Sequence, residues 1–178
     1  NASNGDPLVY GVVDNPDFIL IGAGTGVHLI MGCGYYVNDY QDPKNHGRTV
    51  DDFAAEMIGQ ILDGAWGTDI RAGMIGEIGC TSPWTDTEKR VMQAALVAAA
   101  ETGAAINVHP GRDPDQPQEV ADFIRAAGHS TERVVISHID RTIFDEARLL
   151  RLADGAAPVG AGLGRLRRRQ PQPPQHRQ

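Results

Sequence analysis

The apolar residues of the chain gather in four short stretches that are separated by segments with a helical pattern. Continuous apolar runs at 28–36 (HLIMGCGYY), 72–79 (AGMIGEIG), 104–109 (AAINVH) and 133–139 (RVVISHI) are typical of buried strands. Such runs lack the alternation of half-exposed strands, which favours a parallel sheet covered by helices on its faces. The regular alternation of strand and helix therefore predicts βαβ units of the α/β class.

Capping residues define three helices between these strands. Thr49 is a suitable N-cap for the first helix, and Thr85 with Glu88 forms a capping-box pattern before the second. A glycine closes each helix, because glycine tolerates the left-handed conformation that commonly follows a last helical turn. The predicted helices and their closing glycines are 50–62 with Gly64, 89–102 with Gly103, and 118–127 with Gly128.

The two ends of the chain do not follow this pattern. Residues 1–23 match this strand and helix pattern poorly, because their apolar residues follow no clear strand or helix period. Residues 153–178 form a basic tail of low complexity that cannot build a core. We interpret the abrupt change close to Asp154 as a loss of the native reading frame, with a natural basic tail as the alternative. The structured region predicted from the sequence is therefore 24–152.

Three side chains with metal-ligand chemistry lie at or near the carboxyl ends of successive predicted strands. Glu77, His109 and His138 are separated by 32 and 29 residues, and each interval matches one βα repeat. In parallel α/β folds these strand ends face the active site. Glu77 lies in an apolar strand, where an unpaired carboxylate would cost several kcal/mol, so it needs a cation or a strong donor nearby. Two imidazoles and a carboxylate suit Zn²⁺ or a similar divalent ion, in a doubly wound sheet or in a barrel.

Composition narrows the class of partner. The formal net charge of −7 argues against nucleic acid or an anionic membrane as the main partner. No apolar run approaches the ~20 residues of a membrane span, and the first residues do not resemble a signal peptide. Cys33 and Cys80 are too few for a disulfide scaffold, so a cytoplasmic protein with reduced thiols is expected.

The motifs around these residues resemble the phosphotriesterase family of the amidohydrolase superfamily, in its branch of phosphotriesterase-related proteins. The resemblance covers most of the chain, with its motifs in the family's order. They are GVHLIMGCGYYV (26–37), DIRAGMIGEIGC (69–80), INVHPGR (106–112) and VVISHIDRT (134–142). This resemblance implies an incomplete (β/α)8 TIM barrel that contains about strands three to six.

The resemblance also implies roles for individual residues. Glu77 matches the carboxylate that bridges two metal ions, and His109 and His138 match ligands of the more exposed ion. Asp140 matches an acid near the catalytic site, while Tyr36 and Arg112 lie where substrate-binding loops are expected. The implied reaction is hydrolysis of an ester, lactone, phosphotriester or N-acyl amide by a water molecule that two metal ions, most simply Zn²⁺, activate.

Other ligands that the family uses have no counterpart in this chain. The His-x-His pair of strand one and the Asp of strand eight are missing, so an inactive fragment of a small-molecule hydrolase is expected, with a homodimer as an assembly to test. One alternative is a non-catalytic metal-binding or interaction module. Another is dinucleotide binding by the Gly-rich segment 18–26 (FILIGAGTG), although Val27 stands where that fingerprint continues.

Overall fold

The computed structural model describes residues 8–11, 24 and 28–155. Most of the N-terminal segment lies outside these residues, and so does the Gly-rich stretch 18–26 apart from Gly24. The tail from residue 156 onward, to which the reading-frame hypothesis applies, also lies outside them.

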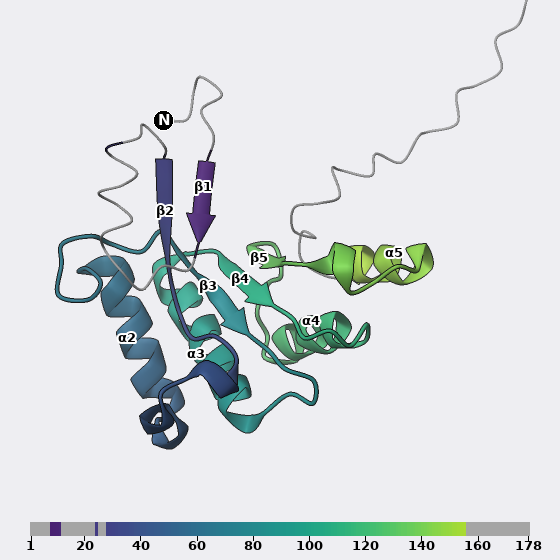
Figure 1. Ribbon diagram of the computed structural model, residues 1–178, viewed down its shortest axis with the longest axis horizontal. Coiled ribbons are helices and arrows are strands. Elements are labelled where there is room, and N and C mark those ends of the chain that lie inside the picture. The colour runs from purple at the N-terminus through teal and green to yellow at the C-terminus, as the bar shows by residue number, and fades with distance from the viewer. Residues whose placement is uncertain (1–7, 12–23, 25–27, 156–178) are drawn as a thin grey trace, which may run out of the picture.

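Five parallel strands form one sheet in the order β1-β2-β3-β4-β5 (Figure 1). Their bounds are β1 Leu8–Gly11, β2 His28–Cys33, β3 Met74–Gly79, β4 Ile106–His109 and β5 Val134–Ile136. The four predicted strands correspond to β2–β5, and the structure adds β1, which was not predicted. β1 was missed because LVYG is too short to show a period, and only its pairing with β2, from Leu8 opposite His28 onward, identifies it.

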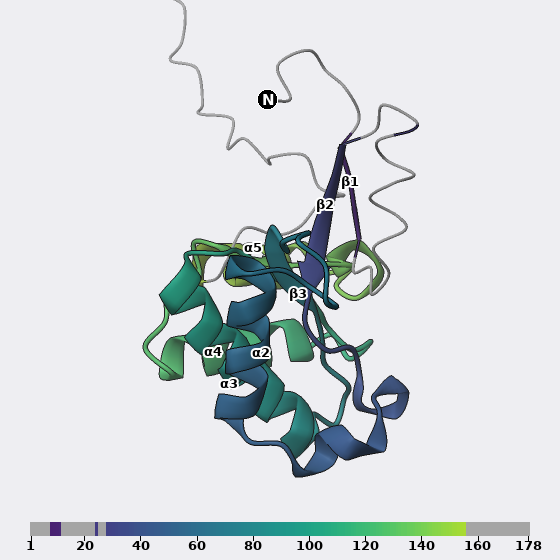
Figure 2. The same cartoon turned by 90° about the vertical axis from the view of Figure 1, so that its left-hand side faces the viewer.

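Within the described residues, four α-helices alternate with these strands: α2 Val50–Leu62, α3 Asp86–Thr102, α4 Gln116–Ala126 and α5 Glu146–Gly155. The same part of the chain has three short 3-10 helices in loops, η1 Asn38–Tyr40, η2 Pro43–Gly47 and η3 Ile139–Arg141. Figures 1 and 2 show α2, α3 and α4 on the same side of the strands. Strands on the inside and helices on one outer side are the arrangement of a barrel wall.

The helix boundaries follow from the capping chemistry. The Thr49 side chain accepts a hydrogen bond from the Asp52 backbone N–H, and Thr85 with Glu88 forms the predicted reciprocal box at the start of α3. Gly103 ends α3 in the left-handed conformation with φ 74°. The helices at 50–62 and near 86–102 are therefore confirmed, whereas α5 was not predicted and continues to Gly155, past the expected end of the structured region at 152.

The predicted strands at 28–36 and 133–139 were too long at their carboxyl ends. β2 ends at Cys33 because Gly34, with φ 147°, turns the chain out of the sheet. β5 ends at Ile136 because the chain turns into η3 through His138, which has a left-handed backbone. Both corrections place polar residues of the motifs in loops at the carboxyl edge of the sheet.

The core lies between the sheet and the helices that cover it. Its largest fully buried side chains come from both layers: Phe53 and Met57 of α2, Ile75 and Ile78 of β3, Met92 and Leu96 of α3, Ile106 of β4, and Ile124 of α4. Burying each such side chain contributes roughly 1.5–3 kcal/mol before the loss of chain entropy. This packing makes the sheet a rigid support for its carboxyl edge.

Candidate metal centre

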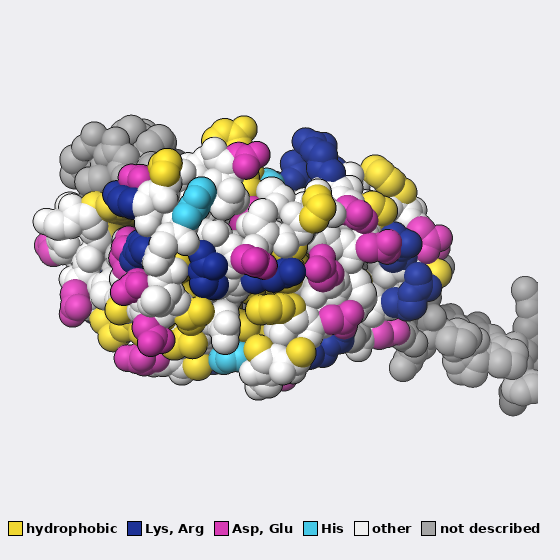
Figure 3. Space-filling model, turned by 90° about the horizontal axis from the view of Figure 1, so that it is seen from below, with side chains coloured by type: hydrophobic (Ala, Val, Ile, Leu, Met, Phe, Trp, Pro, Cys, Tyr) yellow, Lys and Arg dark blue, Asp and Glu magenta, His cyan; other side chains and the backbone are white. Residues whose placement is uncertain are grey.

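The three predicted metal ligands come together at the carboxyl edge of the sheet. Glu77 lies within β3, His109 is the last residue of β4, and His138 follows β5 by two residues. One ligand atom from each residue lies within 4.8 Å of the others, and the described residues contain no second group of this kind. Figure 3 looks onto this end of the molecule, where histidine, acidic and basic side chains are mixed with hydrophobic ones.

A local irregularity of β3 turns Glu77 toward its partners. The register between β3 and β4 shifts between Ile75 and Ile78, which is the pattern of a β-bulge. Gly76 has φ 133°, and a Cβ atom there would overlap the carbonyl oxygen of Asn107. Only glycine fits this close approach of two strands, so Gly76 is required for the backbone that presents Glu77.

Both histidines face the Glu77 carboxylate. His109 Nδ1 lies 3.0 Å from Glu77 Oε2, and His138 Nε2 lies 3.2 Å from Oε1. The two imidazole rings meet edge to face with their centroids 4.7 Å apart. The hydrogen bond from His109 lowers the pKa of the Glu77 carboxyl, in opposition to its partial burial. The carboxylate is therefore ionised near neutral pH and can attract a cation.

The outer nitrogen of His109 has two neighbours. Its Nε2 lies 3.0 Å from the Tyr36 hydroxyl and 3.1 Å from Arg141 Nη2. A guanidinium can only donate, so in this arrangement Nε2 accepts and the ring proton is on Nδ1, where it donates to Glu77. Tyr36, for which a substrate-facing position was expected, is thereby brought into direct contact with a predicted metal ligand.

Buried Glu88 connects the loop of Tyr36 to the rest of this edge. Its carboxylate accepts hydrogen bonds from the backbone N–H groups of Asn38 and Thr81, from the Thr81 hydroxyl, and from the Thr85 cap. Gly79 allows the same loop to pack on β3, because a side chain there would overlap Val37. Glu88 was predicted only as a capping residue, and its second role in joining two loops was missed.

The remaining predicted site residues form no hydrogen bond or ion pair with the three ligands. Arg112 is exposed and makes no hydrogen bond or ion pair with the residues that the structure describes. The Asp140 side chain is also exposed and has no such partner among them, so its catalytic role stays a prediction. Arg141, the next residue, was not singled out. Its only sequence signal was its place in the motif SHIDRT, beside His138.

The donor set fits a divalent metal ion by its chemistry. Two imidazole nitrogens and two carboxylate oxygens converge from three strands, and the side chains of His109 and Glu77 are only 14% and 24% exposed. These are the ligand types that Zn²⁺ and similar divalent ions take in proteins.

In the part of the chain that the structure describes, none of the helices is long and apolar enough to cross a membrane.

Comparison with known proteins gives consistent relationships. The profile of the phosphotriesterase family matches residues 13–164. An N-acetyltaurine hydrolase of Xenopus tropicalis is 42% identical over 129 residues, which are 72% of this chain and 37% of that protein. A phosphotriesterase-related protein of Nematostella vectensis is 38% identical over 149 residues, 83% of this chain and 43% of that protein.

A solved structure agrees with these relatives. The phosphotriesterase homology protein of Escherichia coli, complexed with phosphate in its active site, superposes with a TM-score of 0.75 at 30% identity. The match covers 82% of this chain and 50% of that protein, and the chain spans about two fifths of the curated relatives' length. The five strands are thus part of a (β/α)8 barrel. The chain belongs to the phosphotriesterase family.

Proposed function

We propose that this chain supplies the central part of a zinc-dependent hydrolase that cleaves N-acyl amides. The observation that carries the proposal is the convergence of Glu77, His109 and His138 within 4.8 Å at the carboxyl edge of a family barrel. The amide substrate is supported by relatives that are N-acetyltaurine hydrolases at 42% and 45% identity. Lactones and phosphotriesters are the competing substrates within the family.

Each residue has a defined task in this proposal. Glu77 offers one oxygen toward each histidine and so can be shared between two cations. His109 and His138 provide neutral nitrogen ligands, and Tyr36 orients the His109 ring from its other side. When bound, divalent ions lower the pKa of a water molecule toward neutrality and polarise the bond under attack.

We also propose that the chain by itself is inactive and holds at most one ion. It presents three ligands among its described residues, whereas a two-metal centre needs more than these. Strands β1 and β5 are each paired on one side only within the described sheet. Unpaired edges promote association between chains, so measurements on the purified chain call for dilute solution.

A segment exchange tests the hydrolase proposal. The segment of this chain that matches the Xenopus N-acetyltaurine hydrolase over 129 residues would replace the corresponding segment of that enzyme. The chimera would be loaded with Zn²⁺ or Mn²⁺ and assayed against N-acetyltaurine, a lactone and a phosphotriester, before and after treatment with a chelator. We expect hydrolysis of the amide that disappears with the chelator and returns with metal.

The outcomes separate the alternatives. The chimera could fold and bind metal but cleave none of the three substrates. That result would contradict the hydrolase proposal and support a non-catalytic metal-binding module. A preference for the lactone or the phosphotriester would replace the proposed substrate class. Turnover by the 178-residue chain alone, removed by chelator, would contradict its proposed inactivity and would imply ligands from a second subunit.

A further inference from the structure

We infer that Arg141 and Arg112 form a subsite for a single negative group of the substrate, a sulfonate or a carboxylate, beside the metal centre. This inference rests on the proposed hydrolase function and specifies which amides it takes. The acid would be carried by the part of the substrate that lies away from the bond being cleaved. Neither arginine belongs to the proposed ligand set.

A surface hollow of about 360 Å³ lies beside Arg141, whose guanidinium contacts the predicted ligand His109. It opens where the loops after β4 and β5 meet, and Arg141 borders both the hollow and His109. Its lining residues are Arg112, Pro114, Arg141, Thr142, Ile143, Phe144, Asp145 and Arg148. Arg141 therefore connects the hollow to one of the three predicted ligands.

The charges around this hollow are unbalanced. Arg148 is paired with Asp115 at 3.0 Å, and the carboxylate of Asp145 accepts a hydrogen bond from the Arg148 backbone N–H. Arg112 and Arg141 form no ion pair within the part of the chain that the structure describes. Two guanidinium groups against one carboxylate in the lining leave an excess of positive charge, which favours an anionic ligand.

Arg141 also has unused donors. Its Nε atom is buried without a hydrogen-bond partner, and Nη2 contacts only the imidazole of His109. A buried donor without an acceptor is costly, and such an atom in a folded protein needs an explanation. An anion with two or three oxygens in the hollow would supply acceptors for Nε and a terminal nitrogen together, in the forked geometry that arginine prefers.

Metal ligation by His109 would release Arg141 for this role. A nitrogen that gives its lone pair to a metal carries no proton, so Nδ1 ligation places the ring proton on Nε2. Nε2 can then donate to the Tyr36 hydroxyl but has no lone pair left for Arg141. With a metal ion held there, the guanidinium would lose its only described acceptor, and an oxyanion would be a suitable partner.

The lining also fits the remainder of a small amphipathic molecule. Ile143 lies in the wall, and the Phe144 ring is 85% exposed at the rim, where it can be covered by a ligand. An N-acyl amide with a short acidic amine portion would place its acid at the arginines and its amide toward Glu77. The sulfonate of N-acetyltaurine, the substrate in the names of several relatives, has this chemistry.

Anion binding can be measured on the full chain without metal or turnover. The ¹⁵N-labelled protein, stripped of metal by dialysis, would be titrated with methanesulfonate, with acetate and with neutral dimethyl sulfone at low ionic strength, where charge interactions are least screened. We expect saturable shifts of amide signals in 111–112 and 141–145 with the anions and none with the sulfone. Arg141→Gln should weaken anion binding about tenfold or more.

Matched variants complete the test. Arg112→Gln, at an exposed residue without described partners, should weaken binding several-fold and keeps the test valid if Arg141→Gln does not fold. Arg71→Gln removes the same charge from an exposed residue just before β3, at the opposite end of that strand, and should leave binding unchanged. Equal binding in the wild type, Arg141→Gln and Arg112→Gln, or equal shifts with the neutral sulfone, would overturn the inference. Failure here leaves the chimera assay untouched, and a failed chimera leaves this titration intact.

Discussion

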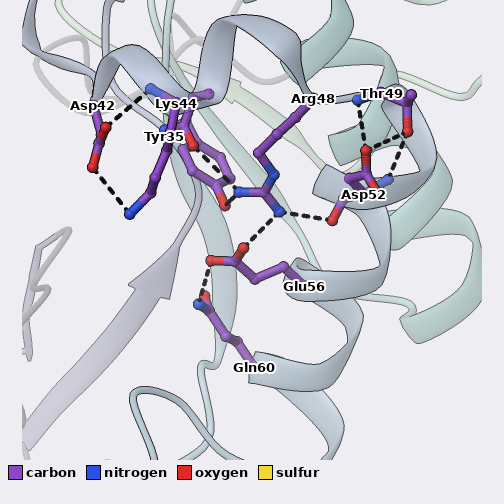
Figure 4. Close-up of polar contacts among 9 residues, drawn as sticks. Tyr35, Asp42, Lys44, Arg48, Thr49, Asp52, Glu56 and Gln60 are labelled. Carbon is purple, nitrogen blue, oxygen red and sulfur yellow. Dashed lines mark hydrogen bonds and ion pairs between the residues drawn. The ribbon is translucent and has the colours of Figure 1, made fainter.

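Two arginines in loops at the carboxyl edge of the sheet are bonded in opposite ways. Arg48 donates to the Tyr35 hydroxyl at 2.6 Å, to Glu56 at 2.6 Å and to the Asp52 carbonyl at 2.9 Å, as Figure 4 shows. Its guanidinium also lies 4.5 Å from the centre of the Phe53 ring. Arg141, by contrast, has a buried Nε without a partner and a single contact, to His109.

The difference indicates what each arginine does. The donors of Arg48 meet acceptors of the protein itself, so its binding energy goes into fixing the loop that starts at Tyr35 against α2. Arg141, which lines the hollow, has one donor at a predicted metal ligand and a buried Nε for which folding provides no acceptor. We therefore interpret the Arg48 cluster as a structural tie and Arg141 as a group kept for a ligand.

The largest expected effect is on turnover at the metal centre. In the chimera, Glu77→Gln should lower turnover by orders of magnitude, because a neutral amide no longer offsets the charge of two cations or holds them together. Steady-state kinetics with metal analysis by mass spectrometry measures this loss. Glu56→Gln, in the Arg48 cluster, removes the same charge and should leave turnover close to that of the unmodified chimera. Two bound metals and normal turnover in Glu77→Gln would contradict the assignment.

The next effect concerns the structural arginine. Arg48→Gln should lower the free energy of unfolding by about 2 kcal/mol, because charge-assisted hydrogen bonds and the stacking on Phe53 are lost together. The expected loss of stability is modest because the Glu56 side chain is 43% exposed, so water screens its charge. Urea denaturation of the chain gives the value. A change below about 0.5 kcal/mol, the range of ordinary surface substitutions, would contradict the structural role.

A smaller effect is expected in alkaline solution. Burial, and next the neighbouring Glu56, raises the pKa of Tyr35 above its usual value. The neutral phenol is thus favoured in the folded protein, and its contribution is complete below about pH 10 and is lost as the pH rises further. Wild type should lose up to about 1.4 kcal/mol per pH unit more than Tyr35→Phe above pH 10. Urea denaturation at several pH values measures the free energy of unfolding of both proteins. If the two values fell in parallel above pH 10, the proposed contribution of Tyr35 would be ruled out.

The smallest expected effect is on stability at Arg141. Because its donors have few acceptors, Arg141→Gln should change the free energy of unfolding by no more than about 0.5 kcal/mol. The same urea experiment used for Arg48→Gln measures both variants side by side. A loss at Arg141 as large as that at Arg48 would remove the contrast between the two arginines, and Arg141 would then be a structural residue.

Much of the fold was accessible from the chain alone. The helix at 50–62 matched α2 to the residue, and the Thr49 cap and the Thr85–Glu88 capping box were predicted, because caps depend on residues about three positions apart. β1 could not be predicted, because four apolar residues are defined as a strand only by their neighbour β2. The ends of β2 and β5 were misplaced for a related reason, since apolar residues continue past the points where the backbone turns.

The candidate site divides in the same way. The ligand chemistry of Glu77, His109 and His138 and their spacing of one βα repeat could be read directly, and the structure brings these three together. The contacts of Tyr36 and Arg141 with His109 could not, because they depend on the conformation of the loops after β2 and β5 rather than on the spacing of strands.

Local pattern therefore determined the elements of this protein, their caps and the residues able to bind a metal. The tertiary structure alone decided that Glu88 accepts bonds from two loops, that both terminal nitrogens of Arg48 find acceptors, and that the buried Nε of Arg141 does not. The physical reason is that caps and periodicity depend on neighbours within one helical turn. Whether a distant donor finds an acceptor depends on strand register and loop packing, which many weak contacts set together.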